Sequence, residues 1–272
     1  MRTQPDLIRH GLKKRGEDDP VTHILNVDTC RRATIAETDK LRAHRNDVSR
    51  HIGRTKDKSP NLIQEMRDLG VTIKNMDEKI KRLEEEINAA LLAMPNLPNE
   101  TVPIGDDEHG NVVVRTVGNP PAFLFKPLPH WEIGERLNII DLKRGAKLSG
   151  SRFYVLKDKG AQLQRALITW MMDIHTREHQ YQEVYLPNLV TTETALRNGQ
   201  LPKFADTMYH DREDDLWMIP TGEVPITNLY RDEILEPGRL PIYHVAHTPC
   251  FRRERAAAGR DTRGIKRVHQ FE

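Results

Sequence analysis

The sequence of 272 residues has few cysteines and no long apolar run, and each shortage excludes a class of protein. Only two cysteines occur, Cys30 and Cys250, and their wide separation argues against a disulfide framework and against a thiolate zinc site. No apolar run approaches the roughly 18 residues that a membrane helix needs. The segment from Met1 to Asp19 is polar and lacks the apolar stretch of a secretory signal. We therefore expect a cytoplasmic protein with no membrane partner.

The net charge is small as well. There are 42 Lys and Arg residues against 40 Asp and Glu residues, so the formal net charge of +2 does not make the whole chain a nucleic-acid binder. Charged residues still make up 30% of the sequence, above the usual quarter, which favours an exposed and elongated helix. Neither GxGxxG nor GxxxxGK[ST] occurs, so nucleotide binding through a glycine-rich loop has no support.

The most regular pattern is an apolar repeat whose spacings alternate between four and three residues. Such spacing is the a/d seam of a coiled coil, sustained here for about four heptads. At 1.5 Å per residue it predicts a helix about 50 Å long, which Pro95 and Pro98 end. The repeat consists of Leu62, Met66, Leu69, Ile73, Met76, Ile80, Leu83, Ile87, Ala90 and Met94.

A weaker heptad frame runs from Ile24 to Ile52, and residues 53–61 are typical of a turn. Each apolar stripe needs a partner, so we expect an antiparallel helical hairpin. From Arg31 to Lys58 nine basic residues stand against four acidic ones, a net charge of +5. Such a surface could follow a phosphate backbone. Charge alone leaves open the commoner alternative, a solvated helix face that binds nothing.

Proline and glycine crowd residues 96–126 around Val112–Val114, which predicts a linker followed by one strand. We place the domain boundary there, giving domains 1–105 and 106–272. After it, residues 161–178 have helical periodicity, and strand patterns without a regular βαβ rhythm indicate an α+β domain with antiparallel strands. The strand candidates are residues 183–186, 215–219, 242–246 and 268–271.

One short motif at the end of the predicted helix matches the inverted zinc-protease signature HxxEH, with His175, Glu178 and His179. Two imidazoles four residues apart could share a metal ion. No third ligand is apparent by spacing, and polar residues at a helix C-terminus are the ordinary explanation. We predict no metal site built from side chains.

A basic segment near the C-terminus carries the strongest chemical signal. From Arg252 to Arg267 seven Lys or Arg residues stand against Glu254 and Asp261, again a net charge of +5. A strand, loop and strand with an arginine at each root suits a triphosphate, because guanidinium groups bind phosphate oxygens bidentately. An aromatic residue such as Phe271 can stack on a base. The residues alone support a phosphate site.

The same segment resembles a family motif. Phe251–Glu254, the loop, and Arg267–Phe271 resemble motif 2 of class II aminoacyl-tRNA synthetases, and the helix, strand and Pro187 before them resemble motif 1, through which that class dimerises. Further segments are similar to the seryl-tRNA synthetase branch in particular. They are Met94–Asn96, Gly150–Phe153, Gly199–Phe204, Ile219–Pro225 and Gly259–Gly264.

The resemblance implies an α+β chain: a coiled-coil arm followed by part of an antiparallel-sheet catalytic domain. It implies a serine--tRNA ligase, which activates L-serine with ATP and Mg²⁺ to seryl-adenylate and transfers serine to tRNA(Ser). It also implies a homodimer through the Pro187 region. The hairpin would be the arm that grips the long variable arm of tRNA(Ser). Its implied tRNA contacts are Arg31, Arg42, Arg45, Arg50 and Arg54.

Residue roles follow from the same resemblance. Arg252 and Glu254 are the implied catalytic pair, with the arginine on the α-phosphate and the glutamate near the adenine or the terminal phosphates. Phe271 would stack on the adenine. The implied ATP-binding residues are Arg252, Arg253, Glu254, Arg267, Val268 and Phe271. The implied serine-binding residues are Thr221, Gly222 and Glu223, whose carboxylate would hold the substrate ammonium.

Two departures from the family pattern stand out. Gly222 occupies the position of an alanine in the family's Thr-Ala-Glu. The chain stops at Glu272, before a further serine-binding glutamate and before motif 3, so the resemblance implies a fragment truncated after motif 2. The alternative is a non-catalytic, synthetase-derived tRNA-binding protein that lacks motif 3. The reading frame beyond Glu272 distinguishes the two.

Overall fold

The computed structural model describes residues 1–55, 59–105, 107–255 and 263–272. These residues form two compact units, Met1–Gly118 and Asn119–Glu272. The domain boundary predicted between residues 105 and 106 stays a prediction. Parts of the predicted turn (56–58) and of the segment Gly259–Gly264 (259–262) lie outside the described residues. Within the described ranges, no helix is long and apolar enough to cross a membrane.

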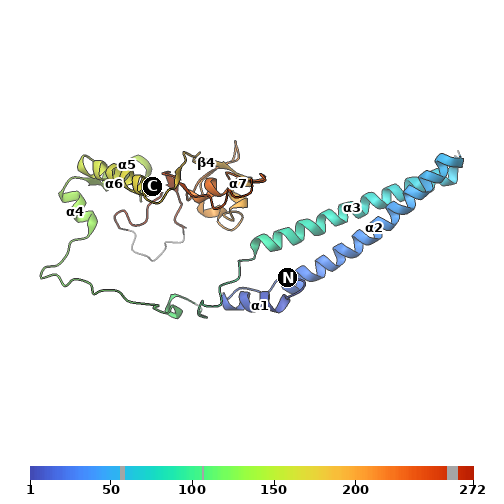
Figure 1. The fold of residues 1–272 in the computed structure, drawn as a ribbon, viewed down its shortest axis with the longest axis horizontal. Helices are drawn as coiled ribbons and strands as arrows, with labels where there is room; N and C mark the ends of the chain where they lie inside the picture. Colours follow the sequence, from blue (N-terminus) through green and yellow to red (C-terminus); the bar gives the residue numbers. More distant parts are fainter. Residues whose placement is uncertain (56–58, 106, 256–262) are drawn as a thin grey trace. The chain divides into compact units, whose positions relative to one another are not determined.

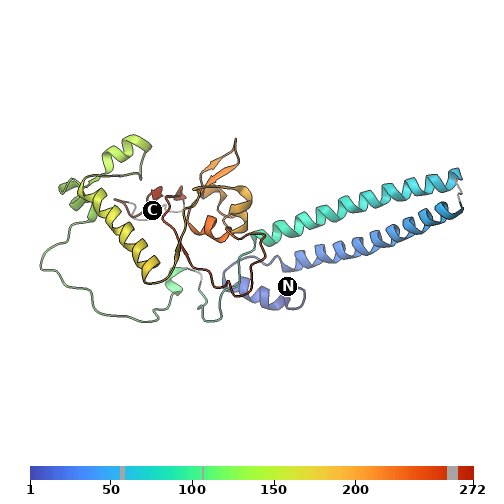
Figure 2. The ribbon, with the colours of Figure 1, turned by 45° about the horizontal axis from the view of Figure 1, so that its top comes forward.

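The first unit is dominated by a hairpin of two long helices, α2 (Val21–Thr55) and α3 (Pro60–Ala93), which run side by side (Figures 1 and 2). All ten residues of the apolar repeat are at least partly buried, and most residues between them are exposed. The periodicity therefore predicted the buried face correctly, because a 4-3 spacing keeps one stripe toward the partner helix. Helix α3 ends at Ala93, two residues before Pro95.

Polar residues on the seam of α2 are accommodated within the helix. Thr34 and Thr38 are buried, and each hydroxyl donates a hydrogen bond to the carbonyl oxygen four residues earlier, at 2.9 and 2.8 Å. This bonding satisfies buried hydroxyl groups within their own helix. The Thr38 hydroxyl also lies 3.5 Å from the sulfur of Met76 in α3. Arg31 and Arg45 lie on the same seam and are half-buried.

The short helix α1 (Pro5–Lys14) and the residues before it pack on the base of the hairpin. Arg2 donates two hydrogen bonds of 2.7 Å to the carboxylate of Asp28, which also accepts one from Arg32 at 3.1 Å. The hydrogen bond from Arg2 is the main cause that lowers the pKa of Asp28. Asp28 thus fixes the N-terminal segment to α2.

No helix or strand occupies residues 111–129, all of which the structure describes. The strand predicted around Val112–Val114 is therefore wrong. These valines are strongly exposed, up to 95% for Val114. A β-branched run becomes a strand only where a neighbouring strand satisfies its backbone groups, and no strand among the described residues pairs with this run.

The second unit is an α+β assembly of short strands, as predicted. Helix α6 (Lys159–Arg177) is its longest helix, and the predicted strands form as shorter pairs. Most pairs are antiparallel, but β3 (Gln182–Glu183) and β7 (His244–Val245) pair in parallel, unlike the expectation. The other elements are α4 (His130–Arg136), β1 (Ile140–Asp141), α5 (Leu142–Ser149), β2 (Val155–Leu156), β4 (Leu189–Thr191), α7 (Thr192–Arg197), η2 (Ala205–Thr207), β5 (His210–Asp211), β6 (Leu216–Met218), α8 (Glu223–Thr227), β8 (Cys250–Phe251) and β9 (Gln270–Phe271).

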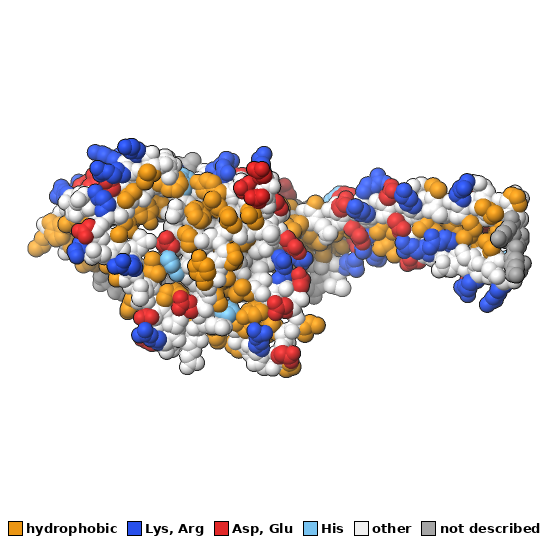
Figure 3. Space-filling model, turned by 90° about the horizontal axis from the view of Figure 1, so that it is seen from above, with side chains coloured by type: hydrophobic (Ala, Val, Ile, Leu, Met, Phe, Trp, Pro, Cys, Tyr) orange, Lys and Arg blue, Asp and Glu red, His pale blue; other side chains and the backbone are white. Residues whose placement is uncertain are grey.

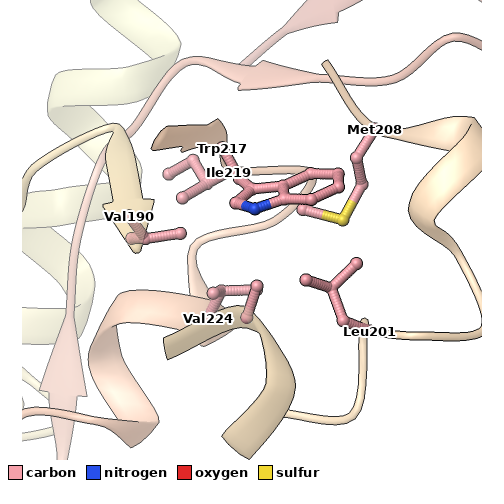
Figure 4. Close-up of a cluster of buried hydrophobic side chains, with 7 residues drawn as sticks. Val190, Leu201, Met208, Trp217, Ile219 and Val224 are labelled. Carbon is pink, nitrogen blue, oxygen red and sulfur yellow. The ribbon is translucent and has the colours of Figure 1, made fainter. Parts of the chain in front are cut away.

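A cluster of buried side chains forms the core beside the sheet β4-β6-β5 (Figure 4). Its members come from strands, loops, α7 and α8: Val190, Ala195, Leu201, Met208, Trp217, Ile219 and Val224. Ile219 and Val224 are both fully buried and flank the segment Pro220–Glu223 on either side. The core therefore anchors both ends of the predicted serine-binding tripeptide.

Candidate nucleotide and amino-acid site

The strands β8 and β9 bring the two halves of the predicted motif together. Cys250 pairs with Phe271, and the backbone N–H of Arg252 donates to the carbonyl of His269 at 2.9 Å. The guanidinium carbon of Arg252 consequently lies 4.8 Å from the centroid of the Phe271 ring. The arginine and the aromatic ring that the sequence assigns to ATP are therefore neighbours.

A cavity of about 420 Å³ opens beside this pair of strands. Three arginines and one glutamate supply its charged lining, so its local charge is positive. That donor set suits an anionic, phosphate-bearing ligand. The lining residues are Gln200, Phe204, Thr207, Pro220, Thr221, Arg252, Glu254, Arg255 and Arg267.

Glu254 and Arg267 form an ion pair within this cavity, with 3.3 Å between Arg267 Nη1 and Glu254 Oε2. The Glu254 side chain is only 12% exposed. Its backbone has φ of +46°, in the left-handed region that non-glycine residues rarely adopt. Arg252 is held by a second contact, because its Nε donates to the carbonyl of Pro220 at 2.9 Å. Both predicted catalytic side chains are thus fixed by neighbours.

A second cavity, of about 380 Å³, shares Thr221 with the first. Its lining also includes Gly222, Thr248, Cys250 and Phe271. A Cβ atom on Gly222 would lie 3.2 Å from Thr248 Oγ1, so this wall is tight. Burial raises the pKa of the Cys250 thiol, which keeps it protonated at neutral pH. Thr221 therefore lies at the boundary between an arginine-rich cavity and a smaller cavity whose lining contains no arginine.

Three predicted site residues do not line these two cavities. Arg253 donates from Nε to the carbonyl of Met208 at 2.8 Å, and its guanidinium lies over the Tyr209 ring. Val268 is buried. Glu223 lies in the first turn of α8 and accepts a hydrogen bond from the Thr221 hydroxyl. Their assigned roles stay predictions.

The structure also adds lining residues that sequence reasoning did not single out. Arg255 follows the predicted catalytic pair directly, and Thr207 lies in η2. Gln200 and Phe204 lie in a segment that resembles the family, although that resemblance carried no role for them. Nothing in the sequence predicted that Thr248 would line a cavity.

The two histidines of the HxxEH match lie at the end of α6, with 3.1 Å between their Nδ1 atoms. One neutral imidazole can donate to the other at that distance. Across the part of the chain that the structure describes, no group of three or more His, Cys, Asp and Glu side chains could hold a metal ion.

The arginines predicted to bind tRNA have different environments on the hairpin. Arg31 and Arg42 pair across to Glu84 and Asp77 of α3, at 2.8 and 2.7 Å. Arg50 pairs with Asp47 of its own helix, and Arg54 is exposed near the end of α2. Arg45 is half-buried on the seam. Basic and acidic side chains are interspersed along the arm in Figure 3. The ion pairs of Arg31 and Arg42 with α3 partly neutralise the net positive charge of α2.

Comparison with known families finds matches in the N-terminal and the C-terminal part of the chain. The profile of the "Seryl-tRNA synthetase N-terminal domain" matches residues 1–98. The profile of the "tRNA synthetase class II core domain (G, H, P, S and T)" matches residues 204–272. The first match covers the helical hairpin, and the second covers β8, β9 and the three arginines that line the larger cavity.

Individual relatives agree along the whole chain. The serine--tRNA ligases of Thermomicrobium roseum and Roseiflexus castenholzii are 54% and 52% identical over all of this chain. The chain spans 62% and 65% of their lengths. The crystal structure of seryl-tRNA synthetase from Pyrococcus horikoshii complexed with ATP has a TM-score of 0.88 at 33% identity, and covers 99% of this chain and 66% of that one. The cytoplasmic serine-tRNA ligase of Naegleria fowleri in complex with AMP has a TM-score of 0.81 at 30% identity, and covers 98% of this chain and 62% of that one.

Sequence identity, the two family profiles and the fold agree from the hairpin to the paired strands that carry Arg252 and Phe271. The chain belongs to the seryl-tRNA synthetase family of class II aminoacyl-tRNA synthetases.

Proposed function

We propose that this chain carries the ATP and serine sites of a serine--tRNA ligase. The observation that carries the proposal is the position of Thr221, which lines both the arginine-rich cavity and the smaller cavity. Adenylate formation needs the carboxylate of the amino acid next to the α-phosphate of ATP. Adjacent cavities with a shared wall supply that proximity.

ATP fits the larger cavity by its chemistry. Arg252, Arg255 and Arg267 line it, and guanidinium groups are the side chains that best match phosphate oxygens. Phe271 lies beside Arg252 in the lining of the smaller, adjoining cavity, and it offers an aromatic face for the adenine. Mg²⁺ usually takes one or two carboxylates together with substrate phosphates, and Glu254 supplies a carboxylate in the lining. When bound, the ion would neutralise phosphate charge.

Serine is assigned to the side of Thr221, Gly222 and Glu223. In the proposed reaction a serine carboxylate oxygen attacks the α-phosphorus of ATP, the bond to the bridging oxygen breaks, and pyrophosphate leaves. This reaction needs no covalent nucleophile from the protein. The arginines stabilise the charge that develops on the phosphate oxygens, and a fixed donor costs no reorganisation at that moment.

We assign the hairpin to tRNA(Ser), with contacts from Arg31, Arg42, Arg45, Arg50 and Arg54. The profile match of residues 1–98 and the net positive charge of α2 support this assignment. A homodimer through the Pro187 region is supported by an apolar face of α6 that is left exposed. This face consists of Leu163, Leu167, Trp170 and Met171. A cytoplasmic location is part of the same proposal.

The test is serine-dependent exchange of pyrophosphate into ATP by the full-length gene product that contains these residues. Exchange that requires serine supports the proposal. Specific tRNA(Ser) binding without exchange would favour the non-catalytic alternative, and exchange that depends on a different amino acid would refute the assignment.

A further inference from the structure

Arg152 contacts the residues next to both of the paired strands β8 and β9, although it lies far from them in the sequence. Its side-chain Nη1 donates to the carbonyl oxygen of Glu254 at 3.0 Å, across 102 residues. Its own carbonyl oxygen accepts from the backbone N–H of His269 at 3.2 Å. The neighbouring ring of Phe153 packs against the His269 ring, with centroids 5.4 Å apart. A single residue therefore contacts the chain just after β8 and just before β9.

The backbone is strained at both ends of the Arg152–Glu254 contact. Arg152 has φ of +65° and Glu254 has φ of +46°. Non-glycine residues rarely adopt this region, and they persist there only where their surroundings hold them. The hydrogen bond from Arg152 is one of the contacts that hold Glu254 in this conformation.

The conformation of Glu254 decides where its carboxylate points. In the left-handed region the carboxylate reaches Arg267 Nη1 at 3.3 Å and lies in the lining of the larger cavity. A return of residue 254 to negative φ would redirect the Cα–Cβ bond and break that pair. Arg152 is half-buried and contacts the backbone of Glu254, not its carboxylate. Arg152 does not line this cavity.

We propose that Arg152 is a positioning residue for the ATP site, which holds Glu254 in its left-handed conformation and thereby sets the Glu254–Arg267 pair. This inference rests on the proposed function only in its expected effect on ATP affinity. Its structural part stands independently, because the backbone of residue 254 can be observed without ligand.

The experiment compares the chain with its Arg152→Ala, Arg152→Gln and Arg136→Ala variants. Arg136 lies exposed in the last turn of α4, so its variant is the matched control for loss of an arginine in the same unit. Crystal structures without ligand give φ of residue 254 and the Glu254–Arg267 distance. Calorimetric titration with ATP gives the affinity, and pyrophosphate exchange by the full-length gene product separates KM from kcat.

In Arg152→Ala we expect residue 254 to leave the left-handed region, and the Glu254–Arg267 pair to open beyond about 4 Å, the limit of an ion pair. ATP affinity should fall about tenfold or more, the scale of one hydrogen bond from a charged donor. The loss should appear mainly in KM for ATP. Arg152→Gln keeps a neutral donor and should recover part of the affinity, and it replaces the alanine variant if that variant does not fold.

A double-mutant cycle with Glu254→Gly isolates positioning from general destabilisation. Once the carboxylate is absent, Arg152→Ala should cost little further ATP affinity, whereas independent effects would add. An unchanged backbone at residue 254 together with unchanged ATP affinity in Arg152→Ala overturns the inference. If the unsubstituted chain binds no ATP, the proposed function fails, and the crystal structure of the variant alone decides the role of Arg152.

Discussion

Arg31 of α2 and Glu84 of α3 form an ion pair across the helical hairpin. Both Nε and Nη2 of the guanidinium donate to the same carboxylate oxygen, at 2.9 and 2.8 Å. The Arg31 side chain is only 27% exposed, so the contact is shielded from solvent more than most surface pairs. An arginine at an apolar seam position is therefore tolerated because the partner helix supplies its counter-charge. Because its charge is already paired, Arg31 should contribute less to tRNA binding than an exposed arginine of the same helix.

We expect Arg31→Gln and Arg54→Gln to act differently. Arg31→Gln leaves Glu84 without this partner, so it should lower the thermal stability of the helices, and it should cost less tRNA(Ser) affinity than Arg54→Gln does. Arg54 is exposed, so Arg54→Gln should weaken tRNA binding and reduce the slope of affinity against salt by about one phosphate contact. Filter binding over a salt series and circular dichroism melts provide the measurements. Equal losses of tRNA affinity in the two variants would contradict this distinction.

Two adjacent arginines provide a matched pair for the ATP site. Arg252 lines the larger cavity, whereas Arg253 contacts the Met208 carbonyl and the Tyr209 ring. Arg252→Ala should lower seryl-adenylate formation by about 10²-fold or more, the scale of losing one preorganised donor. Arg253→Ala should mainly lower thermal stability. Serine-dependent pyrophosphate exchange by the full-length gene product measures the first effect, and exchange that survives Arg252→Ala would remove that residue's role.

The hairpin could be predicted from the sequence because its apolar residues recur at a spacing that only one buried stripe explains. The neighbourhood of Arg252 and Phe271 was also predictable, because the family motif that the sequence resembles contains both residues and places them on two adjoining strands. The contact between Arg152 and Glu254 was not, because it joins segments 102 residues apart and depends on left-handed backbone at two non-glycine residues. The strand expected near Val112 failed for a related reason, because β propensity says nothing about whether a partner strand exists.

The close approach of Gly222 and Thr248 in the smaller cavity gives a prediction about serine binding. An added Cβ at residue 222 would lie 3.2 Å from Thr248 Oγ1, closer than most such contacts, so the hydroxyl must shift. Gly222→Ala should raise the KM for serine less than tenfold with kcat nearly unchanged. Thr248→Ala should relieve the effect when combined with it. Steady-state exchange at varied serine concentration is the measurement, and an equal KM in all variants would show that this wall does not touch the substrate.

Asp141 should make the stability of the second unit depend on acid pH. Its carboxylate caps α5, accepting from the Arg144 backbone N–H at 2.9 Å, from the Arg144 guanidinium at 2.5 Å and from Lys157 at 3.2 Å. These contacts, the backbone hydrogen bond first, hold the pKa of Asp141 well below its usual range. A lowered folded-state pKa means that the stabilisation is complete above the ordinary aspartate pKa of about 3.9 and is lost as the pH falls below it.

We therefore expect Asp141→Asn to lower the melting temperature at neutral pH, and the difference from the unsubstituted chain to shrink as the pH falls below about 4. Tryptophan fluorescence reports this transition selectively, because Trp131, Trp170 and Trp217 all lie in residues 119–272. Asp214→Asn is the control, since Asp214 is an exposed carboxylate in the turn between β5 and β6. A melting-temperature difference for Asp141→Asn that is the same at pH 7 and at pH 3 would mean that the cap does not depend on ionisation of the carboxylate.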